Sequence, residues 1–307
     1  MNNLAVLENG QQALEIREPL LNRVEQFINS LDAKDTTKDA YRKSLKVFEA
    51  WILEKDYSNP SRETILEYKQ YLQDRSLSPQ TTTAYLTALR RFFAYLESVK
   101  IYPNIARDIK GLKKPRGFMK DALTKDEVNI LLEGIERKSL NDLRDYALIN
   151  LMLRTGLRTI EVSRALVSDI GRESGEQVLR VWGKGRDSKD ELVILTLQTY
   201  KPILDYLEAR RDTTGPIFVS HSNRSKETLT TRSIRRIIAD RLKGVGLKTP
   251  RLTAHSLRHT AGTIALSNGA DIVGVKDMLR HSNINTTMIY THNLNRIKNG
   301  AEKFISF

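Results

Sequence analysis

Hydrophobic residues in the first third of the chain recur at the spacing of amphipathic helices. Tyr41, Leu45, Phe48 and Ile52 stand at positions i, i+4, i+7 and i+11, which places all four on one face of a helix. We therefore predict a small all-helical domain over residues 18–100. The stretches with helical patterning are EPLLNRVEQFINSL (18–31), TTKDAYRKSLKVFEAWILEK (36–55), SRETILEYKQYLQD (61–74) and SPQTTTAYLTALRRFFAYLESV (78–99).

Two of these stretches also carry signals for a helix start. Ser78 precedes Pro79, so an N-cap residue is followed by a proline suited to the first helical position. Ser61 is followed three residues later by Thr64 rather than by Glu, which is only part of a capping box. The pattern predicts helices that begin close to these two serines.

A second, larger unit begins near Leu123. Thr124 and Glu127 form a capping box before an apolar run, and the helical pattern of DYALINLMLRTG stops at Gly156. Residues 176–195 alternate in the manner of two strands around a polar loop. We predict a mostly helical unit with one small antiparallel sheet. Its later helices are LQTYKPILDYLEARR (197–211), RSIRRIIADRLKGVG (232–246), the segment around HSLRHTAGTIALSNG (255–269) and DIVGVKDMLRHS (271–282).

Positive charge is concentrated in two parts of the chain. The formal net charge is +13, and Lys and Arg outnumber Asp and Glu by 6 to 1 in residues 101–120 and by 18 to 8 in residues 201–307. This distribution is typical of a nucleic-acid-binding protein. A generally basic soluble enzyme would carry a similar net charge and is the alternative.

Residues 101–121 have the composition of a linker. They combine two prolines, two glycines and a basic cluster without sustained periodicity. We predict a basic interdomain linker whose Lys113, Lys114 and Arg116 could follow a DNA phosphate backbone. A solvated hinge without DNA contacts is the alternative.

Several classes of protein are excluded by composition. No stretch approaches the roughly 18 uninterrupted apolar residues of a membrane span, and the N-terminus lacks a signal-peptide pattern. The chain has no Cys, which excludes disulfides, thiol nucleophiles and thiolate metal sites. We predict a soluble, cytoplasmic protein without a membrane partner.

Arg158 stands at the predicted start of a helix in TGLRTIEVSRAL (155–166). The positive end of the helix dipole disfavours a cation at this position unless an anion is shared. A bound phosphate would supply that anion. An ordinary ion pair with Glu161, three residues later, is the alternative.

AHSLRHT (254–260) places three candidate side chains on one helix. His255 and Arg258 share a face at i, i+3 and together match an array of phosphate oxygens. His255 and His259 at i, i+4 could suggest zinc, but no Glu follows His255 as the HExxH pattern requires. We therefore favour phosphate recognition over a metal site.

The loop GKGRDSK (183–189) places Lys184 between two glycines. Glycines let the backbone approach a ligand closely, and a mobile Lys could donate a proton. The loop lacks the pattern of a nucleotide-binding P-loop. A flexible surface turn is the alternative.

Tyr290 follows His281 by nine positions in HSNINTTMIYTH (281–292). A tyrosine hydroxyl that attacks a phosphodiester forms a covalent phosphate ester, which another hydroxyl can reverse without nucleotide fuel. Arg and His side chains would stabilise the developing negative charge, and a Lys would protonate the departing oxygen. No carboxylate cluster suggests a two-metal route, so we predict no metal and no cofactor. The predicted catalytic set is Arg158, Lys184, His255, Arg258, His281 and Tyr290.

The sequence resembles the tyrosine recombinases of the phage-integrase family and is Xer-like in size. The resemblance spans nearly the full chain and is carried, in this order, by TGLRTIEV, GKG, HSLRHT and LRHSNINTTMIYTH. It implies the same six catalytic residues, with Tyr290 as nucleophile and Lys184 as the lysine of the sheet loop. The acidic residues of RDSKDEL leave Lys189 as an alternative to Lys184.

The resemblance also implies an architecture and partners. It indicates a mainly α protein with an N-terminal helical core-binding domain of SAM-like fold (18–100) and a mostly helical catalytic domain with a small antiparallel β-sheet and a C-terminal tail helix (122–307). The implied partners are a double-stranded DNA core site and further copies of the chain, as a tetramer on DNA and a monomer in solution, with a directionality factor as a further candidate. The expected DNA contacts in the first domain, for which an ordinary exposed helix face is the alternative, are Thr81, Thr82, Thr83, Arg90 and Arg91.

We accordingly predict a site-specific DNA recombinase, or integrase. It would cut and rejoin strands through a 3′-phosphotyrosyl intermediate and a Holliday junction, in DNA recombination or in the integration of a mobile element. A type IB topoisomerase-like enzyme that relaxes one duplex is the first alternative. A DNA-binding regulator without catalysis is the second.

Overall fold

The computed structural model describes residues 23–57, 59–113, 121–182, 188–221 and 227–288 of the chain. The chain divides into two compact units, Met1–Arg116 and Gly117–Phe307. Each unit has its own hydrophobic core.

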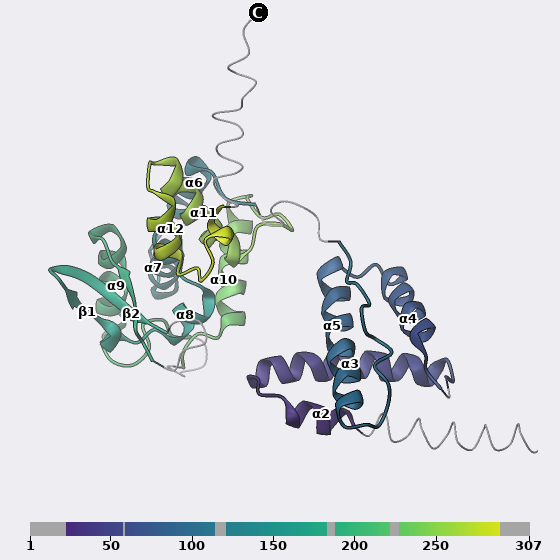
Figure 1. The fold of residues 1–307 in the computed structure, drawn as a ribbon. Helices are drawn as coiled ribbons and strands as arrows, with labels where there is room; N and C mark the ends of the chain where they lie inside the picture. Colours follow the sequence, from purple (N-terminus) through teal and green to yellow (C-terminus); the bar gives the residue numbers. More distant parts are fainter. Residues whose placement is uncertain (1–22, 58, 114–120, 183–187, 222–226, 289–307) are drawn as a thin grey trace, which may run out of the picture. The chain divides into compact units, whose positions relative to one another are not determined.

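The described part of the first unit is a helical cluster. The two long helices, α3 and α5, cross and pack against each other (Figure 1). Leu45, Phe48 and Ile52 of the predicted stripe are buried, and Tyr41 packs against the same core. The helices are α2 (Val24–Ser30), α3 (Asp35–Glu54), α4 (Arg62–Asp74) and α5 (Pro79–Ser98).

Aromatic rings fill much of this core. The rings of Phe48 and Tyr68 meet edge to face at 5.0 Å, a favoured geometry for aromatic pairs. Tyr102, Ala106 and Ile109 also lie in the core, although their segment has the composition of a linker. The chain therefore continues to pack on the first unit well beyond the end of α5.

The helix starts follow the signals read from the sequence. Ser78 accepts a hydrogen bond from the backbone N–H of Thr81, with Pro79 at the first helical position. Ser61 and Thr64 form a complete capping box, because the Thr64 hydroxyl accepts from the Ser61 N–H at 3.0 Å. A threonine hydroxyl thus takes the place that glutamate holds in the usual motif.

The second unit is built around α7. Ten of its sixteen residues are buried, and it packs against α9 and α11. The predicted capping box of Thr124 and Glu127 is present at the start of α6. The helices of this unit in the described residues are α6 (Lys125–Glu133), α7 (Leu140–Thr155), α8 (Thr159–Arg164), the short 3₁₀ helix η1 (Val167–Asp169), α9 (Leu197–Arg210), α10 (Thr231–Gly244), α11 (Ala254–Ser267) and α12 (Ile272–Leu279).

The sheet of this unit contains one strand more than the sequence pattern predicts. β2 (Glu176–Val181) pairs antiparallel with β1 (Ile170–Glu173) on one side and with β3 (Glu191–Ile194) on the other. β1 and β2 are joined by Ser174 and Gly175, both with positive φ, as a tight hairpin requires. β1 has no apolar alternation, because IGRE contains one glycine and two charged residues.

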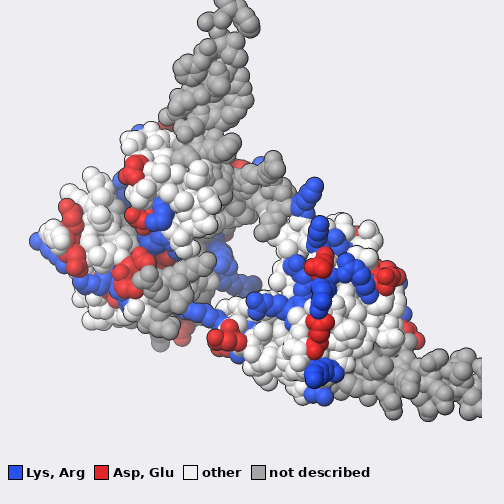
Figure 2. Space-filling model, viewed as in Figure 1, with Lys and Arg blue, Asp and Glu red and all other residues white. Residues whose placement is uncertain are grey.

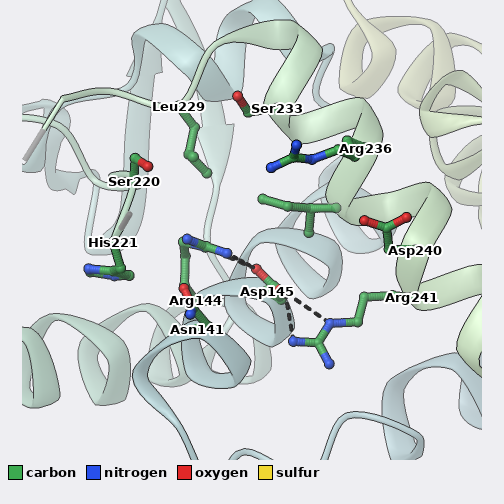
Figure 3. Close-up of a pocket in the computed structure, with 11 residues that line it drawn as sticks. Asn141, Arg144, Asp145, Ser220, His221, Leu229, Ser233, Arg236, Asp240 and Arg241 are labelled. Atoms are coloured by element: carbon green, nitrogen blue, oxygen red, sulfur yellow. Dashed lines mark hydrogen bonds and ion pairs between the residues drawn. The ribbon is translucent and has the colours of Figure 1, made fainter. Parts of the chain in front are cut away.

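A partly buried ion-pair network joins α7 to α10 beside a cavity of about 530 Å³ (Figure 3). Arg144 donates to Asp145 Oδ1 through Nε and Nη2, at 2.9 and 2.7 Å. Arg241 donates to Asp145 Oδ2 at 2.9 Å and to Asp142 Oδ1 at 2.6 Å. Because a buried carboxylate requires such partners, the network fixes α10 against α7.

The predicted fold class, mainly α with one small antiparallel sheet, is confirmed in the described residues. Helices there also lack the combination of length and apolar character that crossing a membrane requires.

Candidate functional site

Gly156 determines how the chain leaves α7. Its φ of +64° is in the left-handed region, and its N–H donates to Met152 at 2.9 Å. A Cβ at this position would overlap the Cδ2 methyl of Leu279 in α12, so both the backbone and the space require glycine. Two residues later the chain reaches Arg158, the N-cap residue of α8.

Arg158 is held by the first turn of α8. Its Nη1 donates to Glu161 Oε1 at 2.7 Å, and its backbone N–H donates to Glu161 Oε2 at 2.7 Å. Its Nη2 donates to the carbonyl of Arg280 at 3.3 Å. The ion pair that we considered as the alternative is therefore present. This ion pair orients the guanidinium of Arg158, and the side chain stays partly exposed.

His255 and Arg258 lie in the first two turns of α11 and differ strongly in exposure. His255 is exposed, whereas Arg258 is only 2% exposed. Arg258 donates to the carbonyl of Gly156 at 2.6 Å and to the carbonyl of Leu279. A cation so enclosed by backbone carbonyls is fixed in place, which is the property that electrostatic stabilisation of an oxyanion needs.

His281 follows α12 and is half-buried. Its Nδ1 lies 2.8 Å from the hydroxyl of the buried Thr287. Burial, and next to it the positive charges of Arg258 and Arg158, lowers the pKa of His281 to about 4. The imidazole is therefore neutral at pH 7. Because the charges of both arginines act on its pKa, His281 lies near them.

His259 is the neighbour of this group on α11. Its ring meets that of His255 edge to face at 4.7 Å. Burial, followed by the charges of His255 and Arg258, lowers the pKa of His259 to about 4. Within the described ranges, no group of three or more His, Asp or Glu residues could hold a metal ion.

Arg158, His255 and Arg258 line one cavity of about 520 Å³. Arg235 of α10 and Lys248, which follows α10, also line it. Sequence reasoning did not single out these two cations. The basic run RSIRRIIADRLK was the available signal for Arg235, but its pattern was interpreted only as a helix.

Lys189, the alternative to Lys184, is held by a carboxylate. Its Nζ donates to both oxygens of Asp169 at 2.6 Å and lies 5.8 Å from the ring centroid of Trp182. An ammonium group in such a pair is not free to follow a departing oxygen, which favours Lys184. Lys184 and Tyr290 lie outside the described residues, so their roles stay predictions.

The predicted DNA contacts of the first unit lie on or near α5. Figure 2 shows Lys and Arg side chains grouped on the visible face of this unit. Arg91 is exposed, and Thr81, Thr83 and Arg90 are partly exposed. Thr82 is fully buried, so its prediction as a DNA contact is wrong: the side chain points into the helical core. Position 82 belongs to the hydrophobic face of α5. The sequence does not indicate this, because Thr82 stands between two other threonines.

Lys113 is exposed at the end of the described part of the linker. Lys114 and Arg116 lie outside the described residues. All three stay predictions as DNA contacts.

Comparison with known proteins identifies the family of this chain. Residues 121–296 match the phage integrase family, and residues 20–102 match the N-terminal SAM-like domain of phage integrases. The chain belongs to the phage integrase family. The predicted tyrosine-recombinase family, the enzyme class and the SAM-like N-terminal domain are thereby confirmed.

Individual recombinases and integrases align with most of the chain. The tyrosine recombinase XerD of Pseudomonas putida is 30% identical over 286 residues, which cover 88% of this chain and 92% of XerD. The XerH recombinase in a post-cleavage complex with difH DNA has a TM-score of 0.73 at 20% identity, covering 96% of this chain and 97% of XerH. A lambda integrase in a tetramer bound to a Holliday junction has a TM-score of 0.71 at 16% identity, covering 89% and 76%. At these identities the two structures show a shared fold.

Proposed function

We propose that this member of the phage integrase family is a site-specific DNA recombinase that cleaves and rejoins strands through Tyr290. The observation that carries the proposal is the cavity lined by Arg158, His255 and Arg258, with the neutral His281 beside the two arginines. Elements far apart in the sequence, α8 and α11, bring these donors to one place. They are suited to the negatively charged oxygens of a phosphodiester.

The chemical steps balance without an external energy source. The Tyr290 oxygen attacks the scissile phosphorus, its proton passes to the exposed ring of His255, and the bond from phosphorus to the 5′ oxygen breaks. Lys184 gives a proton to that departing oxygen. A 5′-hydroxyl from the partner duplex then attacks the 3′-phosphotyrosyl bond and releases the tyrosine.

The remaining donors stabilise the charge that builds on the non-bridging oxygens. Arg158 and Arg258 supply two fixed positive charges. His281 is neutral, so when its Nδ1 accepts from the Thr287 hydroxyl its other ring nitrogen donates a hydrogen bond. Arg235 and Lys248 line the same cavity, and we assign them to contacts with the flanking phosphates.

The assembly follows from the need to exchange strands between two duplexes. We assign residues 18–100 to a core-binding domain, 101–121 to a linker and 122–307 to the catalytic domain. The chain is a monomer in solution and a tetramer on paired core sites; a lambda integrase forms a tetramer when bound to a Holliday junction. We further propose that the protein is cytoplasmic and that it recombines the DNA of a mobile element. A directionality factor would control the direction of the reaction.

A nicked suicide duplex tests the chemistry. The parent protein should form a covalent protein–DNA adduct, and Tyr290→Phe should bind the same DNA with unchanged affinity but form none, because only the hydroxyl has been removed. The adduct should also form in excess EDTA, since arginines rather than a metal carry the stabilising charge. An adduct in Tyr290→Phe would disprove the nucleophile.

A plasmid with two target sites separates recombination from relaxation. Exchange of the segments between the sites supports the proposal. Relaxation of supercoils without exchange would indicate a topoisomerase-like enzyme instead.

A further inference from the structure

Arg280 has an unusual conformation at the end of α12. It is the C-cap residue, with φ +53° and ψ 49°, in the left-handed region that glycine adopts most easily. A residue with a side chain pays a cost of about 1–2 kcal/mol for this conformation. The side chain is nevertheless only 5% exposed, which points to interactions that retain it.

The side chain of Arg280 reaches the carboxylate that orients Arg158. Its Nη2 donates to Glu161 Oε2 at 3.0 Å, and its Nη1 donates to the carbonyl of Met278 at 2.8 Å. The backbone carbonyl of Arg280 also accepts from Arg158 Nη2 at 3.3 Å. Arg280 therefore contacts Arg158 directly through its backbone and indirectly through Glu161.

The net charge of the cluster formed by Glu161, Arg158 and Arg280 depends on the second arginine. Glu161 is 5% exposed and binds Arg158 at both of its oxygens. A buried Glu161–Arg158 pair alone would be neutral, so the carboxylate would offset the charge that Arg158 presents to a phosphate. With Arg280 the cluster has a net charge of +1. Burial raises the pKa of Glu161, but attraction to Arg280, and next to Arg158, outweighs burial and keeps that pKa below its usual value.

We propose that Arg280 is a positioning residue, which offsets the charge of Glu161 so that this carboxylate can orient Arg158 without cancelling its charge. The side chain also ties the end of α12, and with it the adjacent His281, to the start of α8. Arg280 itself need not touch DNA, because its guanidinium is enclosed by Glu161 and Met278. The inference rests on the proposed recombinase chemistry.

Three variants test this inference in single-turnover cleavage of the suicide duplex. Arg280→Gly suits the backbone but lacks the charge, Arg280→Gln lacks the charge at similar size, and Arg280→Lys keeps the charge. We expect Arg280→Gly and Arg280→Gln to cleave about tenfold to a hundredfold more slowly than the parent, with DNA affinity within a few-fold, because Arg158 is misplaced or neutralised. Arg280→Lys should recover most of the rate. Lys276→Ala, which removes a partly exposed positive charge from the same helix, is the matched control and should cleave like the parent.

The outcomes separate this inference from the proposed function. A parent protein that forms no adduct would overturn both. If the parent cleaves and Arg280→Gly cleaves within twofold of it, only the positioning role is wrong. Equal slowing of cleavage by Arg280→Lys and Arg280→Gln would also overturn the positioning role, since the charge at this position would then have no effect. If thermal unfolding shows that Arg280→Gly is not folded, the comparison of Lys with Gln decides the question.

Discussion

Arg258 combines a proposed catalytic charge with a structural role. Its guanidinium is buried and donates to the carbonyls of Gly156 and Leu279, which belong to the segments leading to Arg158 and His281. The residue that we propose to stabilise the phosphate therefore also holds the backbone on both sides of the site. Loss of this one side chain should affect rate and stability together.

Arg258→Ala should reduce the rate of cleavage by roughly a hundredfold or more, since one preorganised donor to an oxyanion is worth about 2.7–4 kcal/mol. Two buried carbonyls also lose their donors, so the melting temperature should fall. Arg258→Lys keeps the charge but not the two-pronged geometry, and it should lie between Ala and the parent. Single-turnover cleavage and thermal unfolding measure the two effects. A rate within a few-fold of the parent for Arg258→Ala would show that the role is structural only.

The two partly buried histidines, His259 and His281, should make stability depend on pH. His259 and His281 have pKa values of about 4 in the folded chain, below the ordinary value of 6.5, so folding favours their neutral forms. Their contribution to stability is fully present above pH 6.5 and is lost as the pH falls from about 6.5 toward 4.

His259→Phe tests this dependence, because phenylalanine keeps an aromatic ring against His255 but does not titrate. The melting temperature of the parent should fall more steeply than that of the variant between about pH 6.5 and pH 4. Carboxylates that titrate in this range are common to both proteins and cancel in the comparison. Parallel curves would show that His259 contributes nothing to the acid sensitivity.

At the level of the elements, the junction between α7 and α8 positions the first arginine. Gly156 combines a left-handed backbone with close contact to Leu279 of α12. The turn thus depends on two helices that lie far apart in the chain. A substitution of Gly156 should therefore disturb the packing of both helices.

Gly156→Ala should lower the free energy of unfolding by about 2–4 kcal/mol, as the left-handed backbone and the overlap with Leu279 add together. Gly215→Ala is the matched control, since Gly215 has a similar φ of +67° but no atom near a Cβ. The control should lose only about 1–2 kcal/mol. Denaturant unfolding of both variants measures the difference. Equal losses would mean that Leu279 moves aside freely.

For the whole molecule, the last segment of the chain bears on assembly. Leu294, Ile297, Ala301 and Phe304 stand at i, i+3, i+7 and i+10, which predicts one apolar helical stripe. Residues 293–307 lie outside the described residues. Such a stripe needs a partner, which is either its own catalytic unit or, as the family resemblance suggests, a neighbouring copy.

A chain that ends at Asn293 should stay folded and bind a single DNA site, but should lose cooperative pairing of two sites and most recombination. The physical reason is that tail exchange would couple the tetramer to the active state of each Tyr290. Gel-shift titration on one-site and two-site DNA, with the plasmid exchange assay, measures these steps. Unfolding of the shortened chain, or recombination at the parental rate, would contradict tail exchange.

Local patterns in the sequence determined much of this protein. The helices, the cap at Thr124 and the stop at Gly156 depend on neighbouring residues, and the order of the motifs was sufficient to indicate the family. The sequence alone could not show that Thr82 is buried, because three adjacent threonines look alike until α5 packs on its core. It could not place Arg235 beside Arg158 or Arg280 against Glu161, since residues 77 and 119 positions apart meet only through tertiary packing. The pKa values of His259 and His281 likewise arise from burial and from charges that folding brings near.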